Sequence, residues 1–174
     1  GGISTMDTEA SVRQAIRMIE AGAEYVRFTA QGEREARNLG EIRKELNAQG
    51  YTTPLVADIH FNPRAADAAA EVVEKVRINP GNYVDKVKTF DLLEYTDEEY
   101  AAELQKIRDR FVPFLDICKK HGTAIRIGVN HGSLSDRIMS RYGDTPEGMV
   151  ASCMEFLRIC RDENFPDVVI SIKA

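Results

Sequence analysis

Basic and amide side chains recur near the ends of the apolar segments of this sequence, where they could together bind an anion. Five segments end in Arg27-x-Thr29, Asp58-x-His60, Arg77-x-Asn79, Arg126-x-Gly128-x-Asn130 and Ser171-x-Lys173. Residues two apart on a β-strand point to the same face, so each set should face one side of a sheet. Burying three arginines and a lysine against one aspartate is costly without a further counter-charge. A phosphate or diphosphate ester would supply that charge.

The richest of these segments runs from residue 126 to residue 137. It is predicted to begin as a strand, break at a glycine and open a helix, with Arg126 and Asn130 on one face. Ser133, with Asp136 three residues later, has the spacing of a capping box and predicts the helix start. The backbone N–H groups of residues 132–134 would then also face an anion.

Other interpretations of these residues remain open at this point. The arginines could pair with acidic residues of neighbouring loops and only tie the sheet together. His60 could support the turn that follows it, and His131 could cap a loop. The sequence shows no Ser/His/Asp set and no Walker loop, so it does not indicate a hydrolase or a nucleotide-triphosphate site. It also shows no zinc-ligand spacing, so it does not indicate a metal site.

The elements that must position these residues alternate between strand and helix. Strands are expected at 24–29, 54–59, 75–79, 124–130 and 168–173. Helices are expected at 7–21, 33–49, from the Asn62-Pro63 cap onward, from the Thr96 capping box to residue 122, and from 146 to about 161. The helix that begins near Thr96 should kink or break at Pro113. This alternation predicts an α/β fold with a parallel sheet, in which ligands bind at the carboxyl ends of the strands.

Composition narrows the class of protein. The length of 174 residues suits one domain, and a net charge of −5 argues against a nucleic-acid partner. No apolar run approaches the roughly 18 residues of a membrane span, and we expect no leader peptide. Cys118, Cys153 and Cys160 have no CxxC spacing and are interpreted as small core side chains. Three unpaired cysteines suit a reducing, cytoplasmic setting.

Several longer motifs resemble one enzyme family. Residues 56–61 (VADIHF), 75–82 (KVRINPGN), 126–134 (RIGVNHGSL), 142–150 (YGDTPEGMV) and 171–174 (SIKA) look like 4-hydroxy-3-methylbut-2-enyl diphosphate synthase, an iron–sulfur oxidoreductase of non-mevalonate isoprenoid biosynthesis. Residues 93–100 (LEYTDEEY) are similar to the larger, three-domain form of plants and some bacteria.

The resemblance implies a TIM barrel that binds 2-C-methyl-D-erythritol 2,4-cyclodiphosphate and opens its ring by a two-electron reduction with loss of water. By the same resemblance, a diphosphate would be held by Arg27, Arg77, Arg126 and Lys173. Asn79 and Asn130 would bond to it or order the ring, Asp58 would contact hydroxyls or orient the cations, and His60, His131 and Ser133 are further candidates. The family carries a 4Fe–4S cluster on a separate C-terminal domain, takes electrons from ferredoxin or flavodoxin, and is expected to form a homo-oligomer.

The sequence departs from the family in extent. A TIM barrel has eight strands and about 250 residues, whereas five strands are predicted here, with a helical insertion at about 83–122. We therefore expect residues 1–174 to form part of a barrel without the cluster domain, inactive alone, with apolar residues of the last strand partly uncovered. Two alternatives stay open: a diphosphate-binding barrel of the dihydropteroate synthase type, and a non-catalytic module that binds an anion or a partner.

Overall fold

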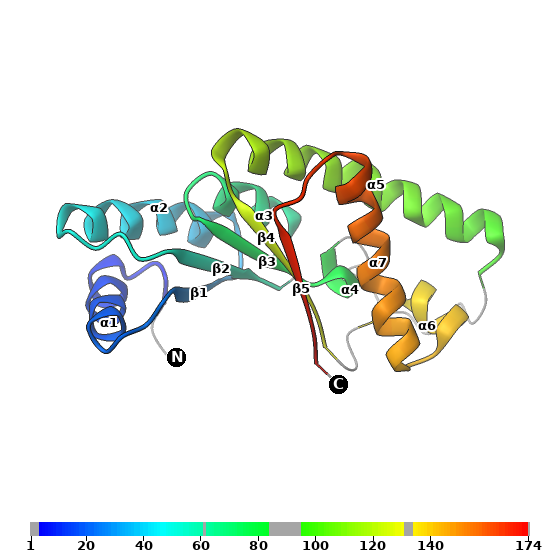
Figure 1. Ribbon diagram of the computed structural model, residues 1–174, viewed down its shortest axis with the longest axis horizontal. Coiled ribbons are helices and arrows are strands. Elements are labelled where there is room, and N and C mark those ends of the chain that lie inside the picture. Colours follow the sequence, from blue (N-terminus) through cyan, green and yellow to red (C-terminus); the bar gives the residue numbers. More distant parts are fainter. Residues whose placement is uncertain (1–3, 61, 84–94, 131–133, 174) are drawn as a thin grey trace.

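The protein contains a five-stranded parallel sheet whose strands follow one another in chain order. The computed structural model describes residues 4–60, 62–83, 95–130 and 134–173. The strands are β1 (Val26–Ala30), β2 (Leu55–Ile59), β3 (Lys75–Ile78), β4 (Ala124–Asn130) and β5 (Val168–Lys173). They pair in the order β1-β2-β3-β4-β5, so in the described residues β1 and β5 are the open edges (Figure 1). Five parallel strands with intervening helices confirm the predicted α/β architecture.

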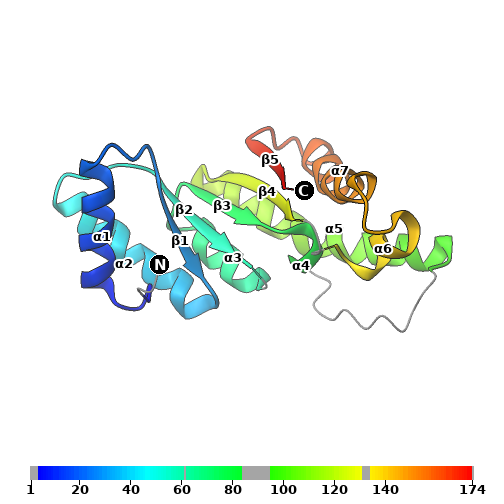
Figure 2. The same ribbon diagram turned by 90° about the horizontal axis from the view of Figure 1, so that it is seen from below.

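Helices cover one face of this sheet and leave the other open. They are α1 (Thr8–Glu20), α2 (Glu33–Ala48), α3 (Pro63–Ala70), α4 (Pro80–Tyr83), α5 (Asp97–His121), α6 (Asp136–Tyr142) and α7 (Pro146–Asp162). Figure 2 shows α2, α3 and α5 behind the strands, with α7 beside β5. Within the described ranges, none of these helices is both long and apolar enough to cross a membrane.

Local sequence signals determine where most helices begin. Asn62 accepts a hydrogen bond from the Arg64 N–H and precedes Pro63, which suits the first turn because it has no N–H to satisfy. Thr96 forms a complete capping box with Glu99 at the start of α5. The Thr145 side chain accepts from the Gly148 N–H at the start of α7. These three helix starts were predicted correctly.

Two local predictions need correction, and one short helix was not predicted. The N-cap of α6 is Ser135, which accepts from the Ile138 N–H, rather than Ser133. Pro80 begins the short helix α4 directly after β3. Helix α5 is not broken at Pro113, because it continues without interruption to His121. Its neighbouring side chains, Phe111 among them, are buried, and this packing outweighs the roughly 3 kcal/mol that an internal proline costs.

The core lies between the sheet and its covering helices. Alternate residues of the strands point into it, including Phe28, Ala57 and Ile127. An aromatic cluster fills the space under α4, α5 and α7, formed by Tyr83, Phe111, Phe114 and Phe156. At the β5 edge this cover ends, and Ile170 and Ile172 are exposed, as expected for a partial barrel.

Candidate anion site on the open face of the sheet

The open face of the sheet forms one wall of a cavity of about 630 Å³. Its lining includes Arg27, Asp58, His60, Arg77, Arg126, Asn130, Ser171 and Lys173. Strand register explains this grouping, because Asp58 pairs with Arg77, Arg77 with Arg126, and Asn130 with Lys173 across neighbouring strands. In-register neighbours point to the same face. The structure thus brings together most of the predicted site residues.

Asp58 is the carboxylate around which three basic groups gather. Its Oδ1 accepts a hydrogen bond from Nη1 of Arg77 at 2.9 Å, and Nε2 of His60 lies 3.5 Å from the same oxygen. Its Oδ2 lies 4.0 Å from Nε of Arg27. The side chains of Asp58 and Arg77 are only 10% and 16% exposed, so this ion pair is largely shielded from water. Arg27 is 63% exposed and only loosely held.

Arg126 and Lys173 lie nearer the β5 edge and lack such a carboxylate. Within the part of the chain that the structure describes, neither has an acidic side chain within ion-pair distance. Arg126 contacts the Ser171 hydroxyl through Nε at 3.4 Å. These two cations remain available for an anionic ligand, which would form the charge-assisted bonds that the protein does not supply.

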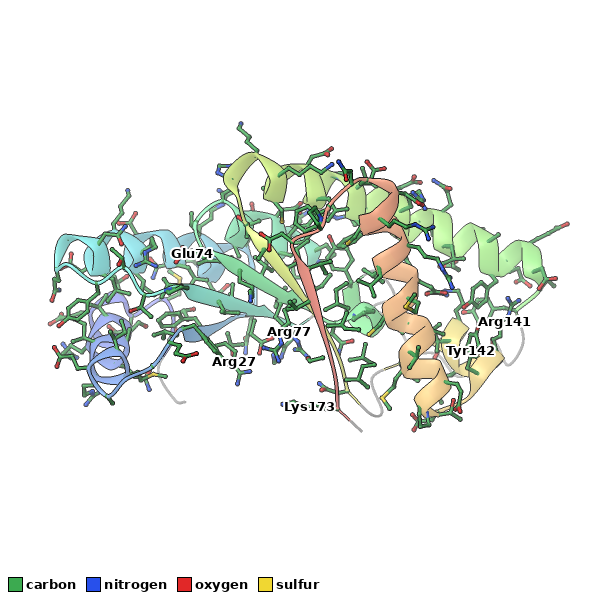
Figure 3. The ribbon with its side chains drawn as sticks, viewed as in Figure 1. Arg27, Glu74, Arg77, Arg141, Tyr142 and Lys173 are labelled. Carbon is green, nitrogen blue, oxygen red and sulfur yellow. The ribbon has the colours of Figure 1, made fainter. Side chains whose placement is uncertain are left out.

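The opposite end of the cavity contains residues that the sequence analysis did not select. Glu24, Glu74 and Lys75 line it, and Figure 3 shows Glu74 far from Lys173. Oε1 of Glu74 lies 2.6 Å from Nη1 of Arg43 and accepts a hydrogen bond from the Leu55 N–H. The negative charge of Glu74 is therefore paired with an arginine that does not line the cavity. Lys75 could have been found, because it precedes Arg77 by two residues on one strand and therefore shares its face.

The balance of charge in the cavity favours an anion. Five arginine and lysine side chains line it, namely Arg27, Lys75, Arg77, Arg126 and Lys173. Three carboxylates oppose them, namely Glu24, Asp58 and Glu74. Arg27 lies near the start of β1, and Arg77 and Arg126 pair in the middle of the sheet, whereas Lys173 pairs with Asn130 at the carboxyl end of the sheet (Figure 3). This is the end at which parallel α/β folds bind their ligands.

The remaining predicted residues have different positions. Asn79 is buried beyond the cavity lining, and its Oδ1 accepts from the Gly81 N–H, so it supports the turn into α4. His131 and Ser133, with the N–H groups of residues 132–134, lie outside the described residues. His60 is part of the cavity through its contact with Asp58.

The three cysteines are buried core residues, as predicted from their spacing. Burial raises the pKa of Cys118 to about 12 and those of Cys153 and Cys160 to about 11. Metal clusters bind thiolates, which these environments disfavour. Among the described residues no group of three or more His, Cys, Asp or Glu side chains is arranged to hold a metal ion. The cysteines of this chain therefore do not fit a 4Fe–4S cluster.

A parallel sheet with helices on one face and a cation-rich cavity on the other defines a class, the α/β-barrel domain. The model of the GcpE TIM-barrel domain family matches residues 2–174. The chain therefore belongs to the GcpE TIM-barrel family, and its five strands are part of a barrel that stays unclosed between β1 and β5.

Curated relatives agree with this family. The chain is 91% identical over 172 residues to the 4-hydroxy-3-methylbut-2-en-1-yl diphosphate synthase (flavodoxin) of Parabacteroides distasonis, covering 99% of this chain and 28% of the relative. Enzymes of the same name from Bacteroides thetaiotaomicron and Porphyromonas gingivalis are 74% and 58% identical, with 98% and 99% of this chain covered. The chain spans 28% and 29% of the length of these two relatives.

Proposed function

We propose that this chain is the substrate-binding part of a 4-hydroxy-3-methylbut-2-en-1-yl diphosphate synthase. The ligand would be 2-C-methyl-D-erythritol 2,4-cyclodiphosphate, whose ring the whole enzyme opens by a two-electron reduction that releases water. The observation that carries the proposal is the pair of cations, Arg126 and Lys173, that face the cavity without a carboxylate among the described residues. Family membership and the names of the relatives support the choice of a diphosphate.

The cavity residues would divide the work of binding. Arg126 and Lys173 would hold one phosphate, and Arg77 would reach the other while Asp58 keeps its guanidinium in place. Arg27, being loosely bound to Asp58, could exchange that contact for the ligand. Asn130 would donate a hydrogen bond, and Asn79 would act indirectly by ordering the end of β3.

The redox part of the reaction would lie elsewhere in the protein. The cysteines of this chain do not fit a 4Fe–4S cluster, so we assign the cluster to a part of the enzyme beyond these residues. The electron donor would be flavodoxin, which the names of the relatives include. We place the enzyme in the cytoplasm, where three free thiols stay reduced, and expect it to work as a homo-oligomer.

Isothermal titration calorimetry with the cyclodiphosphate tests the binding role. The chain should bind weakly, and Arg126→Ala should remove binding, since each charge-assisted bond contributes about 1.5–3 kcal/mol. Arg27→Ala should weaken binding, whereas Arg13→Ala should not. Arg13 is a matched control because its side chain is also 63% exposed and also has an acidic neighbour, Glu9.

Two results would contradict this proposal. Equal losses for Arg27→Ala and Arg13→Ala would mean that binding follows overall charge rather than the cavity. Cys153 is a buried core residue that does not line the cavity, so loss of binding in a folded Cys153→Ala variant would place the site elsewhere.

A further inference from the structure

Gly128 occupies a position in β4 where the backbone does not require glycine. It lies inside the strand and pairs in register with Ser171 of β5. Its φ is outside the left-handed region, so an L-residue could adopt the same backbone. Glycine weakens the interior of a strand, and its presence there often marks a close approach by another group.

The group that approaches is the guanidinium of Arg77. A Cβ at position 128 would lie 2.6 Å from Nε, 3.1 Å from Nη2 and 3.2 Å from Cζ of Arg77. Nη2 of Arg77 also donates to the Gly128 carbonyl at 3.4 Å. The guanidinium therefore lies directly against the backbone of β4 at Gly128.

Arg77 could not easily avoid such a Cβ. Its Nη1 is held at 2.9 Å by the buried Asp58 carboxylate on the other side, in β2. The closest atom, Nε, lies inside the side chain rather than at its flexible end, so moving it moves the whole guanidinium. A displacement away from β4 would change the bond to Asp58 and the direction of the remaining N–H groups.

We propose that Gly128 is a positioning residue of the anion site. Because Gly128 has no side chain, the Arg77 guanidinium can lie against β4 while Asp58 orients it toward the ligand. We call this contact of Arg77 with the Gly128 backbone the seat. The inference rests on the proposed diphosphate site for the identity of the ligand. The seat itself rests on the contacts between Arg77, Asp58 and Gly128. Gly128 touches no ligand and acts only through Arg77.

The seat makes a specific prediction about how two substitutions combine. Gly128→Ala should weaken binding of inorganic diphosphate about tenfold, as expected for one misdirected charge-assisted bond. In a chain that already carries Arg77→Ala, the same glycine substitution should have no further effect. A purely structural glycine would weaken binding by the same factor in both backgrounds.

Titration calorimetry with inorganic diphosphate on the 174-residue chain and its variants measures this coupling. Gly40→Ala is the matched control, because a Cβ there would lie 3.1 Å from Cγ1 of Val72 in a helix contact away from the cavity. It should leave diphosphate affinity unchanged. Unfolding curves of each variant identify any that fail to fold.

A second measurement separates this proposal from the proposed function. In ¹⁵N spectra of arginine side chains, Gly128→Ala should shift the signal that disappears in Arg77→Ala, and Gly40→Ala should not. If that signal shifts but no variant binds diphosphate, the seat stands and the diphosphate site is wrong. An unshifted Arg77 signal, or an equal loss of affinity with and without Arg77, overturns the seat.

Discussion

The substitution Glu155→Ala should strongly destabilise the protein, because Glu155 belongs to a buried ion pair that joins three helices. Nη1 of Arg137 in α6 lies 2.5 Å from Oε2 of Glu155 in α7, and the two side chains are 3% and 5% exposed. The hydroxyl of Tyr100 in α5 donates to the same oxygen at 2.7 Å. The guanidinium groups of Arg137 and Arg141 lie 4.6 and 4.0 Å from the centre of the Tyr100 ring.

The expected loss follows from these contacts. Removing one partner of a buried ion pair costs about 3–5 kcal/mol, because the other charge remains in the protein interior. The Tyr100 hydroxyl also loses its acceptor, which costs about 1–3 kcal/mol for a buried donor. Since these contributions share one network they do not add fully, and we expect a loss of about 4–5 kcal/mol for Glu155→Ala. This is a large part of the roughly 5–15 kcal/mol that stabilises a typical domain.

Replacing both charges should cost less than removing one. A double variant with Arg137→Met and Glu155→Leu fills the space with apolar atoms and leaves no buried charge of the pair. The Tyr100 hydroxyl still loses its acceptor, so the double variant should lose about 1–3 kcal/mol. The matched control is Glu9→Gln, which removes an ion pair with Arg13 on the surface of α1. Exposed pairs of this kind contribute at most about 1 kcal/mol.

Urea unfolding, followed by circular dichroism, measures these differences in the free energy of unfolding. For a chain of this size, 4 kcal/mol corresponds to a decrease in Tm of about 8–16 °C. A Glu155→Ala variant whose free energy of unfolding lies within about 1 kcal/mol of that of the unaltered chain would contradict the large contribution of the buried pair. A double variant that loses as much as the single one would contradict it as well.

Three further outcomes are expected. Burial raises the pKa values of Cys118, Cys153 and Cys160 from 9.0 to about 11–12. The buried, protonated thiols therefore contribute fully to the free energy of unfolding below about pH 9, and this contribution is lost as the pH rises toward about 11–12. Iodoacetamide at pH 8 should modify the three thiols slowly until urea unfolds the chain, and rapid alkylation of the folded chain would contradict their burial. Iron–sulfur reconstitution should give no absorption near 400 nm that survives desalting. Pro113→Ala should raise stability by up to about 3 kcal/mol, because the exposed proline lies inside α5 and removes a helix hydrogen bond; an unchanged Tm would show that the helix has adapted to it. The open β1 and β5 edges should make the chain associate, and light scattering that reports a 19.5 kDa monomer at every dilution would show that these edges are protected.

Sequence alone predicted the five strands, most of the helices and the face of the sheet on which the candidate residues lie. Helix starts at Asn62, Thr96 and Thr145 depend on side chains that bond to N–H groups two or three residues away, so the local sequence contains the whole signal. The alternation of apolar and basic residues likewise identified the five strands and placed Arg77 and Arg126 on the open face. Such short-range patterns need no knowledge of the rest of the fold.

Only the tertiary structure decided which of these residues contact one another. The β2–β3 register places Asp58 opposite Arg77, and packing across β4 places the same guanidinium on Gly128. Register is set by the burial of whole strands against the helices, so no local motif reveals that Arg77 is held by a carboxylate while Lys173 has none within ion-pair distance among the described residues. The same holds for Asn79, whose Oδ1 accepts a hydrogen bond from the Gly81 N–H because α4 forms immediately after β3. Residue types and spacing predicted an anion site, and long-range packing determined its geometry.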